Sequence, residues 1–348
     1  MKAELIETDS PAWPAALART RYDFYHVPGY AALSADDEGG TARALLVEDG
    51  PRGMLLPLVI RPIPGSTTDA TSPYGYPGPL AWGDGGPGFL SAAFEAGIER
   101  LRSEGVVSLF VRLHPLLDAE PPVGVGTLVT HGETVSIDLT LSAAELWANT
   151  RNNHRRDIGK AIRLGYVARM DGRWEHFETF VRLYRETMER LSAEERYMFD
   201  EAYFRRLRDA LGPSLSLWVV LFEDVVAAAV LFVETAGIVQ YHLAGSDERY
   251  AHARPTKLLI HTVANWAKER GDRRLHLGGG VGGADDSLMH FKAGFSDDRH
   301  VFRTLRVVID EGEYTRLAAR VGGSEVGAAG DATDLGGFFP LYRKLPPA

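Results

Sequence analysis

Three apolar runs with very short connections constrain the fold of this chain more than any other feature. The runs are 215–223, 225–235 and 238–245, each rich in Val, Leu, Ala or Ile. They have the length of strands, and the links around Asp224 and Gly237 contain only one or two residues. Links this short join antiparallel neighbours, because parallel strands need a crossover of about a dozen residues. The sequence therefore predicts an antiparallel meander within a sheet.

Other strand and helix patterns surround this meander and repeat coarsely in the first half of the chain. The expected strands are 43–49, 53–61, 106–113, 133–139, 273–277 and 301–309, and the expected helices are 87–104, 174–191, 255–270 and one from Asp200. Ser142 and Glu145 form a capping box that opens a further helix, expected to run to Leu164 before Gly165. Each half thus runs helix, meander, helix, strand. This order favours an α+β fold of two similar halves, each a mostly antiparallel sheet flanked by helices.

Composition excludes several functional classes. The chain has 348 residues, of which 45% are hydrophobic and 24% charged, as expected for one or two globular domains. It has no cysteine, which excludes disulfides, thiolate metal sites and a cysteine nucleophile. Its 11 histidines show no metal-ligand spacing, so no metal is expected. The acidic N-terminal segment and the lack of an apolar run of ~20 residues predict a cytoplasmic protein without a membrane span.

The segment 151–173 is strongly basic. It holds seven Arg or Lys against two Asp, although the whole chain has a net charge of −9. On a helical wheel, Arg156, Lys160 and Arg163 share one face. Three neighbouring cations repel one another unless an anion or water separates them. The row is therefore either a phosphate-binding site or a solvated helix face.

The opposite face of this wheel is apolar and is predicted to be buried. It contains Trp147, His154, Ile158, Ala161 and Ile162. Arg151 falls within this stripe and Arg155 falls at its edge.

Several strings along the chain together resemble the Fem family of aminoacyltransferases within the GNAT acyltransferase superfamily. They are SPYGYPGPL, RNNHRRDIGKAIRLG, YHLAGS, and LHLGGG followed by DDSLMHFKAGF. The resemblance extends from about residue 20 to the FFPLYR tail. It implies two tandem GNAT-like domains. The first would cover 1–140, with the C-terminal segment 310–348 returning to it, and the second would cover 141–309.

The resemblance also implies an activity. Fem-like enzymes move an amino acid from aminoacyl-tRNA to an amine, on a peptidoglycan precursor such as a nucleotide-linked peptide or, in some relatives, on a natural product. No cofactor is expected, because the acyl donor is a co-substrate. GNAT enzymes that use CoA have a glycine-rich turn before the helix expected at 255–270, and here this turn reads DERYAHARPTK without glycine. Aminoacyl-tRNA is therefore preferred over acyl-CoA as the donor. Two alternatives remain, an N-acyltransferase that uses CoA or a carrier thioester and a non-catalytic GNAT-like binding module.

Three residues are catalytic candidates. In the Fem-like pattern the lysine of the FK motif, here Lys292, faces the acyl donor, where a fixed cation would stabilise the oxyanion of the reaction. The alternative is a lysine that extends from an amphipathic segment into solvent. His242 is a candidate general base, with Tyr241 beside it on the predicted strand. Neighbouring strand residues alternate faces, so both can line one cleft only if the strand bulges.

The remaining candidates are for substrate binding. Tyr74 and Tyr76 lie two apart in the proline-rich loop and are expected to face the same way, either toward an acceptor or as aromatic plugs of the turn. Arg112 and His114 end a strand and lie close to this loop in the family-like pattern. The candidates for phosphate contacts are Arg151, Arg155, Arg156 and Lys160.

Overall fold

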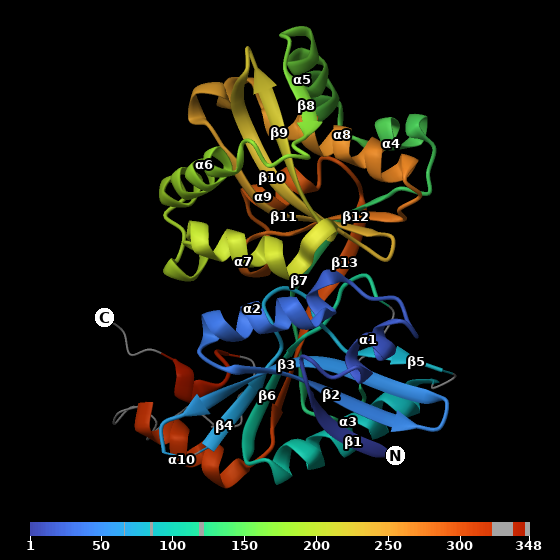
Figure 1. The fold of residues 1–348 in the computed structure, drawn as a ribbon, viewed down its shortest axis with the longest axis vertical. Helices are drawn as coiled ribbons and strands as arrows, with labels where there is room; N and C mark the ends of the chain where they lie inside the picture. Colours follow the sequence, from blue (N-terminus) through green and yellow to red (C-terminus); the bar gives the residue numbers. More distant parts are fainter. Residues whose placement is uncertain (66, 84–85, 118–121, 322–336, 345–348) are drawn as a thin grey trace. The chain divides into compact units, whose positions relative to one another are not determined.

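The structure is a computed structural model, and Figure 1 shows its ribbon. It describes residues 1–65, 67–83, 86–117, 122–321 and 337–344. The chain divides into two compact units. The first is made of Met1–His131 and Val301–Ala348, and the second of Gly132–His300.

The expected domain limits, at 140 and 309, differ from this division at both crossings. The strand β7 (Thr127–Asp138) continues into the second unit, where its last residues pair with β12 (Arg274–Gly279). The strand β13 (Asp298–Val308) continues into the first unit, where its last residues pair with β6 (Val106–Arg112). By their order in the sequence, β7 would belong to the first half and β13 to the second. Each of these strands instead pairs with a strand of the other unit, so the two halves exchange their last strands.

The first unit is built on a sheet in the order β1-β2-β3-β4-β6-β13, with β5 paired to β3 at the side. Its other elements are β1 (Lys2–Glu7), α1 (Ala12–Leu17), α2 (Pro28–Glu38), β2 (Thr41–Asp49), β3 (Arg52–Ile63), β4 (Thr67–Thr71), β5 (Leu80–Trp82), α3 (Gly86–Ser103) and α10 (Glu311–Val321). Side chains of β2 alternate between two cores. Ala44 and Leu46 pack with α1 and α2, whereas Leu45 and Val47 pack with α3. The helices therefore cover both faces of the sheet.

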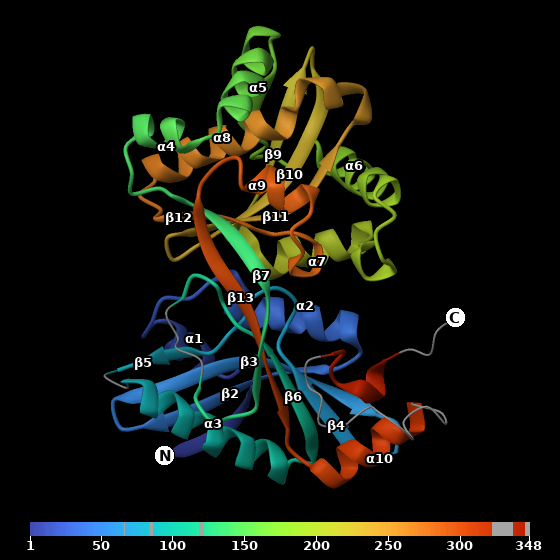
Figure 2. The same ribbon diagram turned by 180° about the vertical axis from the view of Figure 1, so that it is seen from behind.

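The second unit, seen from behind in Figure 2, is built on a sheet in the order β8-β9-β10-β11-β12-β7. Its elements are α4 (Ala143–Asn149), α5 (Asn152–Arg163), β8 (Val167–Met170), α6 (Phe177–Arg190), α7 (Glu201–Leu211), β9 (Leu215–Phe222), β10 (Val225–Thr235), β11 (Ile238–Ser246), α8 (Pro255–Glu269) and α9 (Ser287–Lys292). The predicted meander is confirmed, because β9, β10 and β11 pair antiparallel in succession. Trp218 and Val220 join the core beneath α8, while Leu217 and Val219 are buried on the other face.

The two sheets repeat one arrangement. Each has an antiparallel run that ends in one parallel pair, β4 with β6 in the first unit and β11 with β12 in the second. In each, the strand received from the other half pairs antiparallel with the last strand of that pair. The expected fold class, two mostly antiparallel sheets flanked by helices, is confirmed. Within the described residues, no helix has the length and apolar character needed to cross a bilayer.

The helix expected from Ser142 to Leu164 is broken into α4 and α5. The capping box at Ser142 is present, as predicted. Thr150 and Arg151 then adopt extended backbone angles, and the Arg151 backbone N–H donates to the carbonyl of Gly294 at 2.8 Å. That distant carbonyl replaces the acceptor a continuous helix would supply, so local sequence does not predict the break.

The C-terminal segment contributes to the first unit. Phe339 is buried and stacks on Tyr314 of α10 with 5.8 Å between ring centroids. Tyr342 shares a hydrogen bond of 2.7 Å with Ser108 of β6. Residues 322–336 and 345–348 of the expected returning segment lie outside the described residues.

Candidate functional site

Lys292 is the last residue of α9, and its side chain is buried, with 7% of the residue exposed. Its Nζ donates to the Gly279 carbonyl at the end of β12, at 2.6 Å. Phe291 and Phe295 lie beside it in sequence, and their rings contact each other edge to face. The alternative of a lysine that extends into solvent is therefore wrong. Within the described part of the chain, no carboxylate forms an ion pair with this amine.

The surroundings of Lys292 lower the pKa of its amine. Burial lowers the pKa of Lys292 to about 8, and the carboxylate of Asp286 opposes this change. Asp286 is committed elsewhere, since it caps α9 by accepting from Met289 N at 2.8 Å and also accepts from Val281 N at 2.9 Å. At neutral pH the amine is still mostly protonated. It is thus a buried cation whose only protein hydrogen bond in the described structure is to a neutral carbonyl.

His154 of α5 holds the segment that carries Lys292. Its ring is buried, stacks on Phe295 at 4.8 Å and meets Phe291 edge to face at 5.8 Å. A Cβ on Gly294 would lie 1.6 Å from this ring, so only glycine fits at that position. Burial, with a contribution from Lys257, lowers the pKa of His154 to about 4, which keeps the ring neutral. Sequence reasoning placed His154 in the core but missed its partner, because the two residues are far apart in the chain.

Tyr241 and His242 lie at a bulge in β11. Leu231 of β10 pairs with Leu243, and the next residue, Phe232, pairs with Tyr241, so His242 is the extra residue. The strand therefore meets the condition under which both side chains can serve one cleft, and both are half-buried. Burial raises the pKa of Tyr241, so its phenol stays protonated and can donate a hydrogen bond.

The strands on either side of this bulge are tied together just before it. Gln240, on β11, is opposite His276 in the parallel pair with β12. The His276 Nδ1 lies 2.7 Å from the Gln240 Oε1, and both residues are buried. This contact joins the last paired residues of β11 and β12. Beyond it, β11 contains the bulge and β12 contains the Gly279 carbonyl.

The basic row lies on the exposed face of α5, as expected. Arg156, Lys160 and Arg163 are exposed, whereas Ile158 and Ala161 are buried on the opposite face. Within the described residues, neither Arg156 nor Arg163 has a carboxylate partner. The row is thus accessible both to an anion and to solvent.

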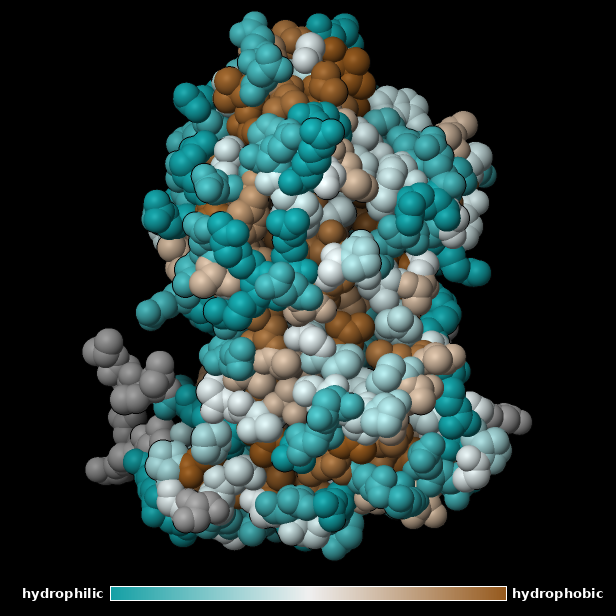
Figure 3. Space-filling view, in the orientation of Figure 1, coloured by the Kyte–Doolittle hydropathy of each residue, from teal (hydrophilic) through white to brown (hydrophobic). Residues whose placement is uncertain are grey.

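Because the helix breaks between α4 and α5, three residues that the helical wheel places in the buried stripe are not buried. Trp147 is on the separate helix α4 and is 37% exposed, and Ile162 is 55% exposed. Arg151 is exposed at the break instead of lying in the apolar stripe. Arg155 donates through Nη1 to the carbonyls of Trp147 and Ala148, at 3.1 and 2.9 Å, so it caps the end of α4. Figure 3 shows hydrophobic side chains (brown) at the end of this unit, at the top of the view, where α5 ends.

Three backbone N–H groups in the turn before α8 donate to carbonyls of the turn itself. The N–H groups of Tyr250, Arg254 and Lys257 donate to the carbonyls of Asp247, Ala251 and Arg254, and Arg254 has a positive φ of 53°. Such a turn presents few N–H groups to a pyrophosphate. Among the residues that the structure describes, no group of three or more His, Asp or Glu is placed to hold a metal ion.

In the first unit, the proline-rich loop does not present its two tyrosines alike. Gly75 between them has a φ of 99°, so the loop is not extended there and the expectation of a shared direction is wrong. Tyr74 is 39% exposed. Tyr76 packs inward, edge to face with Tyr25 at 5.7 Å and Phe302 at 5.2 Å. Tyr76 thus behaves as an aromatic plug, whereas Tyr74 is partly exposed to solvent.

Buried polar side chains anchor this loop. His114 shares a 2.9 Å contact with the carboxylate of Asp23 through Nε2, while its Nδ1 accepts from the backbone N–H of Leu116 at 3.1 Å. The Nε2–H of His26 donates to the carbonyl of Gly78 in the loop at 3.0 Å. His114 is therefore a structural residue here. Arg112, which was expected near this loop, donates to the Ser72 carbonyl where the loop begins, at 2.8 Å.

Comparison with known proteins supports this interpretation of the fold. The model of an acetyltransferase (GNAT) domain family matches residues 148–292, which includes α5, the bulged strand and Lys292. No curated protein matches the chain at a significant level. Among solved structures, FemX has a TM-score of 0.68 at 14% identity, over 91% of this chain and 99% of FemX.

Two further structures share the fold at lower similarity. The C-terminal domain of an Agrobacterium fabrum protein described as a lysylphosphatidylglycerol synthetase has a TM-score of 0.56 at 14% identity, over 91% of this chain and 98% of that one. A Bacteroides thetaiotaomicron protein of unknown function has a TM-score of 0.56 at 11% identity, over 85% and 96%. The resemblance to Fem-like proteins is therefore confirmed at the level of fold, and residues 148–292 are similar to an acetyltransferase (GNAT) domain.

Proposed function

We propose that the chain is an acyltransferase that moves an amino acid from aminoacyl-tRNA to an amine of a peptidoglycan precursor or natural-product acceptor. The observation that carries this proposal is Lys292, a buried amine at the end of α9 without a carboxylate partner in the described structure. Isolated buried charges are costly, and proteins keep them mainly where function uses them. The fold shared with FemX supports the same reaction class.

The reaction needs no covalent intermediate. The acceptor amine attacks the acyl carbonyl of the ester, a C–N bond forms, and the C–O bond to the ribose then breaks. Lys292 would stabilise the negative charge on the carbonyl oxygen or on the departing ribose oxygen. The attacking amine loses a proton to His242 at the bulge, to which we assign the role of base, and the departing ribose oxygen gains a proton, so that the products are an amide and a free ribose hydroxyl. Tyr241, whose phenol stays protonated, would donate a hydrogen bond to the same centre.

The donor is proposed from the turn before α8 and from the basic row. That turn lacks glycine, and three of its backbone N–H groups donate to carbonyls of the turn itself, which disfavours a CoA pyrophosphate. Arg156, Lys160 and Arg163 on α5 offer a row of cations to the phosphates of tRNA. Thermal unfolding with CoA or with aminoacyl-tRNA separates the two donors, because only a bound donor raises the unfolding temperature.

The test of the proposal is turnover by Lys292 variants. Charged tRNA is incubated with a panel of amines, and amide products are measured by mass spectrometry. Lys292→Met should lower the rate by a factor of about 10²–10³, and Lys292→Arg should restore only part of it. Lys268→Met is the matched control, because Lys268 in the same unit also donates to a backbone carbonyl, that of Leu139 at 3.2 Å. A Lys292→Met variant that folds and keeps turnover within a few-fold of the parent removes this lysine from the mechanism.

Two other functions are compatible with the fold. An N-acyltransferase that uses CoA or a carrier thioester is favoured by the matched family, which is described as an acetyltransferase domain. Stoichiometric CoA binding would support that function. A non-catalytic GNAT-like binding module is the third, since fold alone does not establish activity. Turnover with any donor would exclude it.

A further inference from the structure

Trp147 on α4 is a large aromatic side chain that the second unit leaves 37% exposed, although the helical wheel places it in the buried stripe. Its indole meets the half-buried ring of His261 on α8, with 5.0 Å between the ring centroids and 57° between the ring planes. Within the described residues, this is the one ring contact that the indole makes. Because the two planes are tilted, the contact is not face-to-face stacking, and part of the indole remains open to a planar ligand.

The surroundings of Trp147 hold the indole in place. Leu146, the preceding residue, packs against the core of the second unit. Asn265 donates through Nδ2 to the carbonyl of His261 at 2.9 Å and lies 3.4 Å from the Nε2 of that ring. Burial lowers the pKa of His261, so its ring is neutral at pH 7 and supports the indole by packing. Little ordering of the side chain would therefore be needed on binding.

The chain that follows Trp147 carries only positive charge up to Arg156. It contains Arg151, Arg155 and Arg156 and no acid. Arg151 and Arg156 are exposed, and Arg155 is half-buried. Arg155 donates through Nη1 to the carbonyl of Trp147 at 3.1 Å, which places its charge at the same end of α4 as the indole. In the described part of the chain, no carboxylate lies within 4.0 Å of these three guanidinium groups.

The nearest acids in the sequence are bound elsewhere. Asp157, which follows Arg156, forms an ion pair with Lys257 of α8 at 2.7 Å. Glu145 accepts from the backbone N–H of Ser142 at 2.7 Å in the capping box of α4. Neither carboxylate therefore neutralises the arginines at the junction of α4 and α5.

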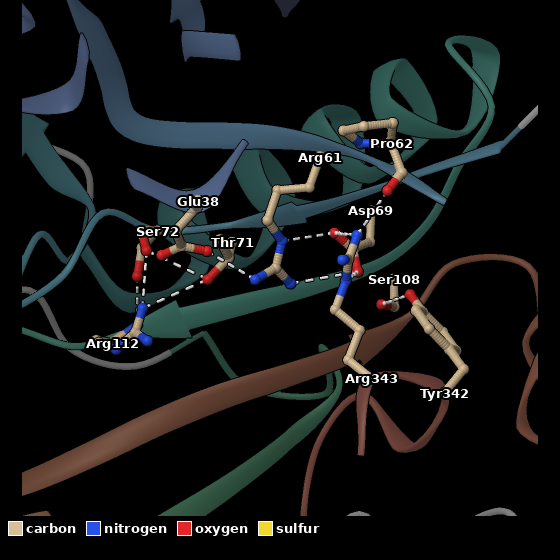
Figure 4. Close-up of polar contacts among 10 residues, drawn as sticks. All are labelled: Glu38, Arg61, Pro62, Asp69, Thr71, Ser72, Ser108, Arg112, Tyr342 and Arg343. Carbon is tan, nitrogen blue, oxygen red and sulfur yellow. Dashed lines mark hydrogen bonds and ion pairs between the residues drawn. The ribbon is translucent and has the colours of Figure 1, made fainter. Parts of the chain in front are cut away.

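Two arginines of the first unit show the opposite arrangement. Arg61 donates to Glu38 at 2.7 Å and to Asp69 at 2.8 Å, and Arg343 donates to Asp69 at 3.1 Å (Figure 4). Their guanidinium groups are fixed by carboxylates of the protein itself. The three arginines after Trp147 have no such partners, so a phosphate of a ligand can take that place.

The junction of α4 and α5 is bonded to the segment that contains Lys292. The backbone N–H of Arg151 donates to the carbonyl of Gly294 at 2.8 Å, and Gly294 is two residues beyond Lys292. Trp147 precedes Arg151 by four residues, which is about one turn of helix. The structure thus joins an open indole and unpaired arginines to the segment of the candidate catalytic lysine.

We propose that Trp147 stacks on an unpaired base at the single-stranded 3′ end of aminoacyl-tRNA, while Arg151 and Arg156 contact its phosphates. Proteins bind single-stranded nucleic acid by a positively charged surface with aromatic side chains on which bases stack. The bases of a duplex already stack on one another, so an unpaired base is the one that offers its face to the indole. The proposal rests on the proposed function in naming tRNA as the source of the single strand.

Direct binding tests the site without any turnover. The probes are an RNA hairpin with a single-stranded 3′ ACCA overhang and the same hairpin with a blunt end, each titrated with the full chain and followed by fluorescence anisotropy. We expect the overhang hairpin to bind at least about tenfold more tightly than the blunt one. Trp147→Leu should abolish this preference, because it keeps an apolar side chain against His261 and removes the aromatic face. Trp147→Phe should keep part of it.

Trp266→Leu is the matched control. Trp266 is a half-buried tryptophan of the same unit, and its ring is already occupied by Arg270 at 5.1 Å and by Trp218 at 5.2 Å. This variant should keep the full preference for the overhang.

Salt separates stacking from charge. The loss of affinity for the overhang hairpin in Arg156→Gln should shrink as salt rises, because the charges are screened. The loss in Trp147→Leu should persist, because stacking on an indole does not depend on ionic strength in this way. A loss in Trp147→Leu that disappears at high salt would overturn the proposal.

Two further results would overturn it, namely equal binding of the two hairpins and a preserved preference in Trp147→Leu. If Trp147→Leu does not fold, fluorine NMR of the parent labelled with 5-fluorotryptophan decides. The chain has six tryptophans, and the signal of Trp147 is assigned through Trp147→Phe. We expect this signal to shift with the overhang hairpin and not with the blunt one, and an unshifted signal would refute the site.

The two proposals can fail separately. The hairpins carry no amino acid and no product is measured, so failure of the Lys292 turnover test leaves the binding result intact. Loss of the preference for the overhang would in turn leave the turnover test of Lys292 unaffected.

Discussion

Replacing Lys292 by Met should make the protein more stable at neutral pH while it removes the proposed activity. The buried amine has its pKa lowered from 10.5 to about 8. Each pKa unit corresponds to 1.36 kcal/mol, so holding the charged amine in the folded state costs about 3 kcal/mol. Met removes this cost but also removes the hydrogen bond to the Gly279 carbonyl, which contributes about 1 kcal/mol. The expected net gain in the free energy of unfolding is about 2 kcal/mol at pH 7.

The gain should depend on pH in a defined direction. Below pH 8 the amine is protonated in both the folded and the unfolded chain, so the full cost is present. Between pH 8 and pH 10.5 the folded form loses its proton first, and the parent becomes more stable relative to Lys292→Met. The gain therefore shrinks as pH rises through this range. The difference in the free energy of unfolding between the parent and Lys292→Met at each pH cancels the contribution of the other titrating groups, because both proteins share them.

The assay is urea unfolding of both proteins at several pH values from 6.5 to 10.5. Hydrogen exchange of peptides from β12 and α9 reports on the same region locally. Lys268→Met controls for the loss of a half-buried lysine of the same unit that is also bonded to a carbonyl. A Lys292→Met protein that is less stable than the parent at pH 7, or a difference that stays constant up to pH 10.5, would refute the reasoning.

Three further predictions concern the rest of the second unit. Gly294→Ala should destabilise it by several kcal/mol, because the new Cβ would lie 1.6 Å from the His154 ring, and adding His154→Ala should recover part of the loss in thermal unfolding. Additive losses would show that the two sites do not interact. Arg156→Glu with Arg163→Glu should weaken tRNA binding at low salt, with a smaller effect as salt rises, whereas unchanged affinity would return this face to solvent. Calorimetry should detect weak CoA binding or none, and tight stoichiometric binding would remove the preference for a tRNA donor.

The parts of the fold that depend on local pattern could be predicted from the sequence. The meander from Leu215 to Ser246 is predicted by apolar runs with short links, and the start of α4 is predicted by the capping box at Ser142. The end of α4 could not be predicted. It depends on a hydrogen bond from Arg151 to the carbonyl of Gly294, and no local propensity encodes a partner so distant in the chain.

At the candidate site, too, local sequence predicts the residues but not the contacts that they make with distant parts of the chain. Residue type and motif identified Lys292, but its burial is set by packing between α9 and β12. The bulge at His242 is a mismatch in pairing between two strands, and the sequence of β11 alone does not reveal it. The sequence predicts a phosphate contact for Arg155 because it is basic, but it does not predict that Arg155, from within α5, also donates to the carbonyls at the end of α4.

The two halves of the chain keep the same architecture but place different residues at the ends of their parallel strands. In the second unit β12 ends in glycine, and the Gly279 carbonyl accepts from a buried lysine. In the first unit β6 ends in Arg112, which donates to the carbonyl of Ser72. In both, the described structure matches a buried or half-buried cation with a neutral carbonyl where a carboxylate could have been used. A carboxylate partner would stabilise either cation, but it would also repel a negatively charged ligand or transition state. This is the arrangement that the proposed role of Lys292 requires, because its counter-charge would then be the oxyanion that develops during acyl transfer.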